Sequence, residues 1–359
     1  MGKRDLRLLQ EGRVTFEVPP GEVTKSSEVF YNPVMEFPRD VSVAVYRALL
    51  ESGSFLDALS ASGVRALRVA KEVGLEVTAN DLNPSAVKLI KKNAKRNNLK
   101  IKVEKRNASA LMAGNYFDII DIDPFGTPVP YIDTAVRSAR KFLSITATDT
   151  AALCGTYPDT CWRRYLARTA RTEFLHELGI RVLAAYVVRT AARFDISAEP
   201  IFAHSKHHYY RLYFRMGKGA ERCNKLLDQT RTINWNPKTL ERKKSEDSIE
   251  LGPIWMGELW DKNLVKKVLR ETNSGKFNTK NKMIKLLEII YEETGMPPLY
   301  FDIHRICKSL NRPVPPFKLI YAALENSGIK SSRTHFSPTG IRAECDVTKI
   351  KELINSIPS

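Results

Sequence analysis

Long apolar runs are missing from this 359-residue sequence. None approaches the roughly 20 residues that a membrane-spanning helix needs. The charged start, from Met1 to Leu6, is not followed by the apolar stretch of a signal peptide. Leu6 also stands where N-myristoylation requires Ser or Thr. We therefore expect a cytoplasmic protein with no membrane segment.

Paired cysteines are missing as well. The five cysteines stand at positions 154, 161, 223, 307 and 345, an odd number with no C-x-x-C pair. This pattern favours reduced intracellular thiols over a disulfide framework or a zinc site. The six histidines show no metal-ligand spacing beyond His207 and His208, which fall in a strand pattern. We therefore predict that the protein holds no metal.

Acidic residues are the scarcer charged kind. The sequence has 57 Lys and Arg against 40 Asp and Glu, a formal charge of +17 with a pI near 9.6. From Gly217 onward, 25 basic residues stand against 17 acidic ones, which leaves +8 there and +9 before it. A single basic tail would not make both parts basic. A nucleic acid partner explains the balance, because phosphate contacts supply most non-specific affinity; a basic protein without such a partner is the alternative.

Strands and helices alternate from Ser54 onward, which is typical of a parallel sheet. Asn83 and Pro84 place a capping residue and a first-turn proline before one of the helices. A short strand is expected at 11–19, and two strand patterns, 198–204 and 208–216, predict a terminal hairpin. The other predicted strands are 54–59, 76–80, 100–104, 118–122 and 142–148, and the predicted helices are 40–51, 63–73, 84–97, 131–140 and 174–193.

Aromatic and basic residues alternate in the second strand of that hairpin, where Tyr209, Arg211 and Tyr213 interleave with Tyr210 and Leu212. We favour a half-buried strand with one solvated face. A face on which RNA bases stack is the alternative.

The length exceeds that of one ordinary domain, so we expect two. Residues 1–217 form the Rossmann-like α/β domain. Residues 218–251 are rich in charge and poor in large apolar side chains, which indicates a basic linker or flexible connector. Residues 252–359 combine short helices with a turn-rich stretch at 331–341, which predicts a smaller α+β domain of winged-helix-like kind.

The segment from Phe117 to Gly126 points most directly to chemistry. An apolar, β-branched run predicts a buried strand that stops at Asp123-Pro124-Phe125, because proline has no N–H to donate within a sheet. Ligands bind at the carboxyl ends of such strands. A carboxylate, a backbone carbonyl and an aromatic face therefore meet there, which suits methylation of an exocyclic amine. A strand-ending turn that happens to contain Asp is the alternative.

A second set of residues indicates a nucleotide-like cofactor. Ser60 to Gly63 allow a tight strand-to-helix turn, although one glycine is a poor match to G-x-G-x-x-G. Asp81 follows Gly63 by 18 residues, where an acidic side chain binds ribose hydroxyls. S-adenosylmethionine has no phosphate, so this loop fits it better than NAD. Asn107 and Ala108 are placed to meet the adenine.

Six segments occur in order: VFYNPVMEFPRD (29–40), DALSASGVRALR (57–68), NDLNPSAV (80–87), DIDPFGTPVPYIDTA (121–135), TATDTAALCG (146–155) and VRTAARF (188–194). With GPIWMGELWD at 252–261, they make the whole chain resemble the tRNA (guanine-26, N2) dimethyltransferases, in particular the archaeal members. The resemblance implies a class I methyltransferase fold. It also implies an enzyme that transfers one or two methyl groups from S-adenosyl-L-methionine to N2 of guanosine 26 in tRNA.

The resemblance also implies roles for particular residues. It places Arg39, Arg65, Asp81, Asn107 and Ala108 on the cofactor, beside Ser60 and Gly63 of the predicted turn. It places Asp123 next to the target amine and Phe125 stacked on guanine. We expect the Pro124 carbonyl to accept a hydrogen of the same amine, and Phe30, Asn32, Thr148 and Arg333 to contact the substrate. Many relatives carry paired cysteines before the GPIW-like segment, where this chain retains only Cys223.

Two other functions remain open on the sequence. One is an amino-methyltransferase that acts on DNA adenine or a protein side chain, which would share the Asp-Pro-Phe motif. The other is a non-catalytic tRNA-binding protein, against which the presence of both Asp81 and Asp123 argues. We expect a monomer whose partner is tRNA.

Overall fold

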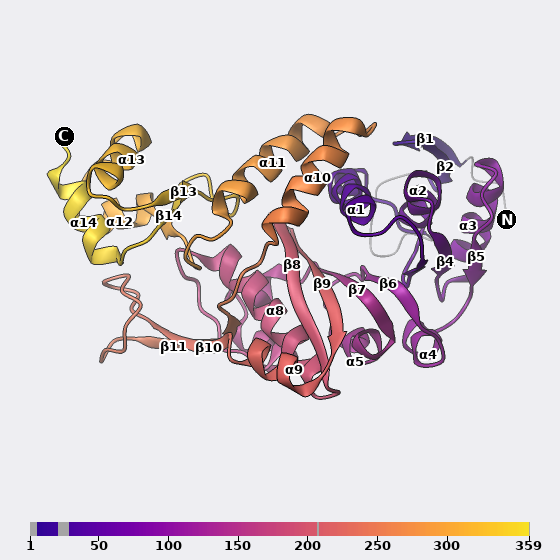
Figure 1. The fold of residues 1–359 in the computed structure, drawn as a ribbon, viewed down its shortest axis with the longest axis horizontal. Helices are drawn as coiled ribbons and strands as arrows, with labels where there is room; N and C mark the ends of the chain where they lie inside the picture. The colour runs from indigo at the N-terminus through magenta and orange to yellow at the C-terminus, as the bar shows by residue number, and fades with distance from the viewer. Residues whose placement is uncertain (1–5, 21–28, 207, 359) are drawn as a thin grey trace. The chain divides into compact units, whose positions relative to one another are not determined.

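A computed structural model describes residues 6–20, 29–206 and 208–358 (Figure 1). His207, one of the two adjacent histidines of the sequence, lies outside them. The chain divides into two compact units. The first unit contains Met1–Thr146, Tyr213–Lys218 and Lys262–Leu287; the second contains Ala147–Leu212, Gly219–Asp261 and Glu288–Ser359.

The chain begins with a β-hairpin where one strand was predicted. Strands β1 (Arg7–Glu11) and β2 (Val14–Val18) pair antiparallel. The turn between them contains Gly12 at a φ of +52°, a conformation that glycine adopts without steric cost. Phe16 and the other inward residues of β2 are buried. The predicted strand 11–19 corresponds to β2, but its first residues belong to the end of β1 and to the turn.

A seven-stranded sheet forms the core, in the order β5-β4-β3-β6-β7-β9-β8. The pairs β4–β5, β3–β4, β3–β6 and β6–β7 are parallel, as the alternation of elements predicted. The strands are β3 (Ser54–Asp57), β4 (Glu76–Asn80), β5 (Lys102–Glu104), β6 (Phe117–Ile122), β7 (Ala139–Ala147), β8 (Ile196–Lys206) and β9 (Tyr209–Lys218).

Helices connect these parallel strands, as in other open α/β sheets. They are α2 (Val64–Arg68), continued by the π-helical turn η2 (Val69–Val73), α3 (Pro84–Arg96), α4 (Ala108–Ala113) and α5 (Val129–Ser138). Asn83 caps α3 through its side-chain oxygen, which accepts from the Ser85 N–H at 2.9 Å. The cap read from the sequence is thereby confirmed.

Strand β9 is buried on both faces, so the prediction of a half-buried strand was wrong. Tyr210 and Leu212 on one face, and Arg211 and Tyr213 on the other, are each at most 1% exposed. The physical reason is that a helix covers each face: Tyr46 packs edge-on against Tyr213 on one side, and Gly179 lies so close to Tyr210 on the other that no Cβ would fit. These residues of β9 also cannot stack on RNA.

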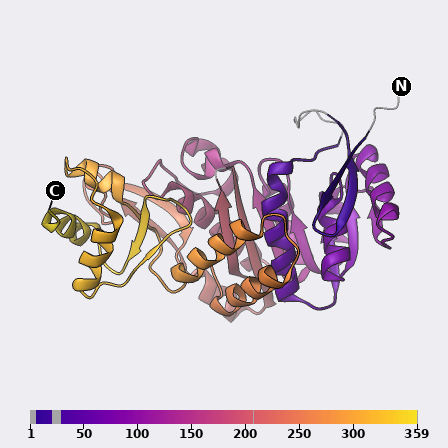
Figure 2. The ribbon, with the colours of Figure 1, turned by 90° about the horizontal axis from the view of Figure 1, so that it is seen from above.

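Helix α1 (Glu36–Leu49) begins four residues earlier than predicted. Helix α10 (Lys262–Ser274) packs against it within the first unit, although more than 200 residues separate the two in sequence. Figures 1 and 2 show α10, in orange, beside the indigo α1. Helix α11 (Lys280–Glu293) follows α10. The 262–287 segment therefore belongs to the unit that carries the parallel strands.

The predicted connector 218–251 is folded rather than flexible. It contains α9 (Ala220–Leu227), β10 (Thr230–Trp235) and the start of β11 (Ile249–Trp255), which pairs antiparallel with β10. Trp235 anchors it, because its indole N–H donates to the Glu173 carboxylate at 2.9 Å and its ring packs edge-on against Phe174. One tryptophan in a charged segment was not enough to predict from the sequence that 218–251 is folded.

The second unit also contains α6 (Thr150–Leu153), α7 (Pro158–Tyr165) and the largely buried α8 (Leu175–Ala192). Its C-terminal part has the predicted winged-helix-like character. Strands β12 (Phe301–Asp302), β13 (Ser331–Arg333) and β14 (Gly340–Ala343) form an antiparallel sheet in the order β12-β14-β13, accompanied by α12 (Ile303–Ser309), α13 (Phe317–Asn326) and α14 (Val347–Ser356).

A fully buried ionic cluster lies in this second unit. Arg342 Nη1 donates to Glu177 Oε1 at 3.0 Å, and Arg342 Nε donates to Glu293 Oε2 at 2.8 Å. Arg181 Nε donates to Glu177 Oε1 at 2.8 Å. Glu177 also accepts the backbone N–H groups of Leu299 and Tyr300. The cluster ties α8 to the C-terminal sheet.

Candidate active site

The carboxyl ends of three neighbouring strands build the candidate site in the first unit. Strands β4, β3 and β6 are adjacent and parallel, so their carboxyl ends share one edge of the sheet. Asp81, Ser60 and Asp123 follow β4, β3 and β6 respectively. The loops that carry these three residues therefore lie at the same edge of the sheet.

The turn after β3 is fixed by its own hydrogen bonds. Ser60 Oγ donates to the Asp57 carbonyl at 3.0 Å, and the Gly63 N–H donates to the Ser60 carbonyl at 2.7 Å. Gly63 has a φ of +79°, and a Cβ there would lie 2.9 Å from an atom of Ile90. Only glycine fits both constraints. The single glycine of this loop is therefore required by its geometry.

Asp81 joins the loops after β3 and β4. Its Oδ2 accepts the Ala61 N–H at 2.8 Å, and its Oδ1 accepts the Asn83 N–H at 2.8 Å. An ionised carboxylate has about four acceptor sites, so two bonds leave capacity for ribose hydroxyls. The carboxylate is held in place before any ligand arrives.

Asn107 and Ala108 follow β5 at the start of α4. The Asn107 side-chain oxygen accepts the Ala110 N–H at 3.1 Å, which makes it the helix cap. Ala108 is buried, at 4% exposure. The pair is thus a rigid helix start, and a small side chain at 108 leaves room for a flat ring.

Arg39 is buried in α1 and already has a carboxylate partner. Its Nε donates to Glu11 Oε2 at 2.9 Å, its Nη2 to Glu11 Oε1 at 2.5 Å, and its Nη2 also reaches the Asn32 carbonyl at 3.1 Å. Burial alone would raise the pKa of Glu11, but the bonds from Arg39 and Tyr31 hold it below its usual value. Glu11, on β1, was not predicted as a site residue.

Arg65 connects two carboxylates. Its Nη1 donates to Asp121 Oδ2 at 2.8 Å, and its Nη2 pairs with Asp123 Oδ2. Tyr46 donates its hydroxyl to the same Asp121 oxygen at 2.6 Å, and also contacts Ser144 Oγ at 3.0 Å. Arg65 thus links the candidate catalytic carboxylate, Asp123, to the buried carboxylate of Asp121 in β6.

Sequence reasoning missed Asp121, Tyr46 and Ser144. Asp121 had a signal, because it is a carboxylate inside an apolar run and fully buried in β6. Such a group requires a partner. Tyr46 and Ser144 gave none, because Tyr46 lies 75 residues from Asp121 and 98 residues from Ser144 and meets them only in the folded chain.

Asp57, at the end of β3, is a further buried carboxyl that the sequence did not single out. Burial, and then the negative charge of Asp121, raise its pKa to about 7. In the unfolded chain an Asp releases its proton near pH 4. The folded protein therefore binds more protons between these values, and its free energy of unfolding should fall as pH rises from about 4 to about 7.

Asp57→Asn should flatten this pH dependence. The variant should gain stability relative to the parent as pH increases, because the neutral amide carries no buried charge. Urea unfolding at pH 4.5 and pH 8 measures the change, with exposed Asp133→Asn as the control. The same difference in unfolding free energy at both pH values would contradict the assignment.

Phe125 presents its ring to solvent, at 55% exposure. The ring of Phe30 packs edge-on against it, with centroids 4.0 Å apart. Pro124 between Asp123 and Phe125 is buried. Asn32, close to Phe30 in sequence, caps the 3-10 turn η1 (Pro33–Met35) by accepting the Val34 N–H at 2.9 Å. An exposed aromatic ring therefore adjoins the candidate carboxylate in sequence.

Thr148 and Arg333 belong to the second unit. Thr148 is half-buried directly after β7. Arg333, in β13, is exposed and makes a two-point ion pair with Glu292, with distances of 2.9 and 2.6 Å from its Nε and Nη2. Asp149, beside Thr148, accepts from the Tyr165 hydroxyl at 2.7 Å and from Arg164 Nη1 at 3.1 Å.

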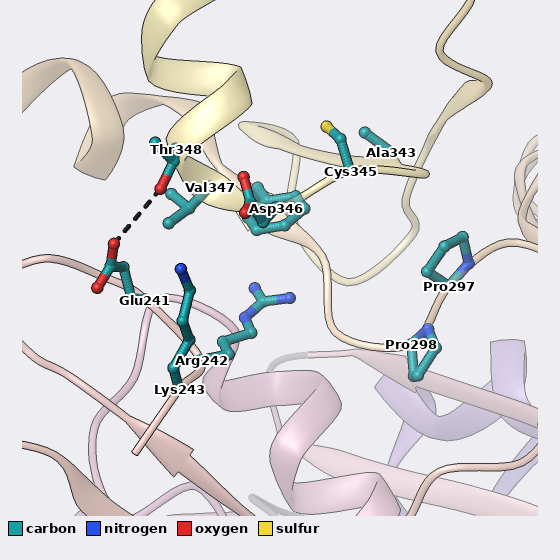
Figure 3. A pocket seen from close by; sticks show the side chains of 11 residues that line it. Glu241, Arg242, Lys243, Pro297, Pro298, Ala343, Cys345, Asp346, Val347 and Thr348 are labelled. Carbon is teal, nitrogen blue, oxygen red and sulfur yellow. Dashed lines mark hydrogen bonds between the residues drawn. The ribbon is translucent and has the colours of Figure 1, made fainter. Parts of the chain in front are cut away.

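A separate pocket of about 210 Å³ lies in the second unit, around the start of α14 (Figure 3). Glu241 and Thr348 form a hydrogen bond of 3.4 Å at its edge. Arg242 in its wall donates to the carbonyls of Leu299 and Tyr300. None of the residues predicted to bind cofactor or substrate lines this pocket.

Two searches of the described residues gave no match. Among the helices in the described ranges, none is long and apolar enough to cross a membrane. Within the same ranges, no group of three or more His, Cys, Asp or Glu side chains is arranged to hold a metal ion.

Comparison with known proteins identifies the family. The N2,N2-dimethylguanosine tRNA methyltransferase family matches residues 10–355. Relatives called tRNA (guanine(26)-N(2))-dimethyltransferase include one from Methanothermobacter thermautotrophicus, 40% identical over 96% of this chain and 98% of the relative. Another, from Methanocaldococcus jannaschii, is 37% identical over 97% and 98%.

A solved structure agrees with the sequence relatives. Trm1 from Pyrococcus horikoshii, in complex with S-adenosyl-L-methionine, is 34% identical, with a TM-score of 0.90 over 97% of this chain and 100% of that chain. The likeness extends through both compact units. This chain belongs to the N2,N2-dimethylguanosine tRNA methyltransferase family.

Proposed function

We propose that this protein transfers one or two methyl groups from S-adenosyl-L-methionine to the exocyclic N2 of guanosine 26 in tRNA. The observation that carries this proposal is the group at the end of β6. There Asp123 is held by the buried Arg65, and Phe125, two residues further along the chain, has an exposed ring. Both residues follow β6 of the parallel sheet. The chain belongs to a family whose relatives are named for this activity.

The residues around the carboxyl ends of β3 to β5 fit the cofactor. The turn from Ser60 to Gly63 brings backbone close to a ligand, and the Asp81 carboxylate is preset for ribose hydroxyls. The rigid start of α4 suits adenine, with Asn107 engaged as the cap and Ala108 leaving space. Arg39 and Arg65 supply positive charge for the carboxylate of the methionyl end.

Asp81→Ala should weaken binding of S-adenosylmethionine about tenfold or more, because it removes a preset acceptor for two hydroxyls. Calorimetric titration measures the dissociation constant. Glu76→Ala, an exposed change at the other end of β4, is the control. Unchanged affinity in Asp81→Ala would place the ribose elsewhere.

The guanine N2 lone pair is delocalised into the ring, which makes the amine a poor nucleophile. S-adenosylmethionine supplies the electrophilic methyl group. Asp123 and the Pro124 carbonyl accept the N–H hydrogens and turn the lone pair toward that methyl. As the N–C bond forms and the bond from sulfur to the methyl breaks, which leaves S-adenosylhomocysteine, Asp123 would stabilise the positive charge that develops on the amine and take up its proton. After one transfer an N–H remains, so the same acceptors can act twice.

Arg65 has a positioning role in this scheme. Its pairing with Asp121 and Asp123 holds the Asp123 carboxylate in position for the substrate. Tyr46 in turn orients Asp121. A base drawn out of the tRNA stack would lie against Phe125, with Phe30 behind that ring. Asn32, Thr148 and Arg333 are further proposed substrate contacts.

We also propose the division of labour along the chain. Residues 1–217 bind the cofactor and carry out transfer, 218–251 connect, and 252–359 bind tRNA. We place the protein in the cytoplasm as a monomer that holds no metal. Unpaired cysteines support this compartment, since all five cysteines of the described residues are free thiols.

Purified protein, labelled S-adenosylmethionine and unmodified tRNA test the proposal. Label should enter a transcript with guanosine at position 26 and not a matched transcript with adenosine there. Transfer that persists on the second transcript would refute the site assignment and favour an amino-methyltransferase of another kind. Absence of transfer to any tRNA would favour a non-catalytic tRNA-binding protein.

A further inference from the structure

The positive charge of the C-terminal part is concentrated in one short segment. Residues 262–287 contain eight Lys and Arg and one acidic residue, Glu271, a net charge of +7. Residues 217–261 contain eight basic and eight acidic residues, and residues 288–359 contain nine and eight. Of the +8 carried from Gly217 onward, all but one charge therefore lies in this segment.

The segment presents its basic side chains to solvent. Leu264, Val265 and Val268 are buried on the face of α10 that packs toward α1. Met283 and Leu287 are buried on α11. Five basic side chains of the segment are exposed and make no ion pair with any residue in the described ranges: Lys267, Arg270, Lys276, Lys282 and Lys285. We call these five the basic hairpin surface.

The turn between the two helices is fastened to α1. Thr279 donates its backbone N–H and its hydroxyl to Asp40 Oδ2, at 3.0 and 2.6 Å. Asn278 Nδ2 donates to Glu36 Oε1 at 2.6 Å. Asp40 is also held by Arg68 Nη1 at 2.6 Å. The basic hairpin surface is therefore attached to the helix that carries Arg39 of the candidate site.

A second basic segment, 84–106, differs in its pairing. There Lys92 and Arg96 both pair with Glu17, and Lys102 pairs with Glu104 at 2.9 Å. Three of its nine basic side chains are therefore paired, whereas Lys88, Lys91 and Lys95 are exposed and make no ion pair with any described residue, which suits them as a control. The module of residues 288–359, where Arg333 pairs with Glu292, is nearly neutral.

We propose that the basic hairpin surface binds the phosphate backbone of tRNA and supplies the main sequence-independent part of its affinity. The inference rests on the proposed function. Unpaired lysines release counterions from phosphates when they bind, so each contact adds to affinity and to its salt dependence. Attachment to α1 gives the bound tRNA a fixed register on the catalytic unit. The tRNA-binding function predicted for the whole of 252–359 is thereby assigned chiefly to α10 and α11.

The test compares two triple variants of the full chain with equal loss of charge. One is Lys276→Gln, Lys282→Gln, Lys285→Gln. The control is Lys88→Gln, Lys91→Gln, Lys95→Gln, three exposed lysines of α3. Equilibrium binding of an unmodified tRNA transcript is measured from 50 to 300 mM salt, with calorimetry of S-adenosylmethionine as the check on folding.

The variant with Lys276, Lys282 and Lys285 replaced should bind tRNA at least about tenfold more weakly at 150 mM salt. The slope of the logarithm of its association constant against the logarithm of salt concentration should become less negative by about 2 to 3. The control should change affinity by less than about twofold. An unchanged slope in the hairpin variant, or an equal loss in the control, would overturn the proposal. Binding is measured without methyl transfer, so the two proposals can fail separately. If the hairpin variant loses tRNA binding as expected but the parent protein does not methylate guanosine 26, the proposed function is refuted and the binding proposal stands.

Discussion

Asp123→Ala is expected to lower methyl transfer by about 10²- to 10⁴-fold, the usual effect of removing a positioned acid–base group. Without the carboxylate, the guanine amine keeps its delocalised lone pair, and its developing charge is left unbalanced. S-adenosylmethionine should still bind within a few-fold of the parent, because Arg65 retains Asp121 as a partner at 2.8 Å. Single-turnover transfer to tRNA and calorimetry of the cofactor measure the two effects.

Asp133→Ala is the matched control, an exposed Asp on α5 shortly after the same motif. It should leave both transfer and cofactor binding unchanged. If Asp123→Ala instead abolished cofactor binding, Asp123 would be a cofactor ligand rather than the group that faces the amine. Wild-type transfer in Asp123→Ala would remove it from the chemistry altogether.

The second large effect concerns stability. Arg342→Ala should lower the free energy of unfolding by about 3–5 kcal/mol, because it leaves the carboxylates of Glu177 and Glu293 buried with less compensation. Arg333→Ala, which breaks an exposed ion pair with Glu292, should cost only about 0–1 kcal/mol. Urea unfolding of both variants measures the contrast. Equal losses in the free energy of unfolding would contradict the view that burial determines how much each ion pair contributes to stability.

The same cluster predicts a dependence on acid. Burial would raise the pKa of Glu177, but Arg342 and Arg181 outweigh it and lower the value to about 2. The unfolded carboxyl titrates near 4.3. Stability from this group is therefore present above that pH and is lost as pH falls toward 2. In Arg342→Ala this loss should begin at higher pH.

Local patterns were enough to single out those candidate residues that stand at the ends of predicted strands or in the turns after them. Asp81 and Gly63 were found from the spacing between a strand end and a small-residue turn, and Asp123 from a strand that stops at proline. The structure gives each of the three the local geometry that such positions require. The parallel pairing of β3 to β7 followed from the alternation of elements, whereas the order of the strands was not predicted.

What the sequence did not predict depends on contacts between distant residues. Tyr46 meets Asp121 only because α1 packs on the sheet, and nothing in an amphipathic helix marks one tyrosine for that role. The burial of both faces of β9 follows from the helices that cover them, α1 through Tyr46 and α8 through Gly179, and its alternating pattern does not reveal these contacts. The charge of 262–287 was visible, but its attachment to α1 through Thr279 was not.

The central claim is that this chain methylates N2 of guanosine 26 in tRNA. Its most direct test is mass spectrometry of nuclease fragments from an unmodified transcript incubated with the protein and S-adenosylmethionine. The account predicts N2-methylguanosine or N2,N2-dimethylguanosine in the fragment that contains residue 26, and no other methylated nucleoside. A methyl group on another atom of that guanosine, or in another fragment, would contradict it.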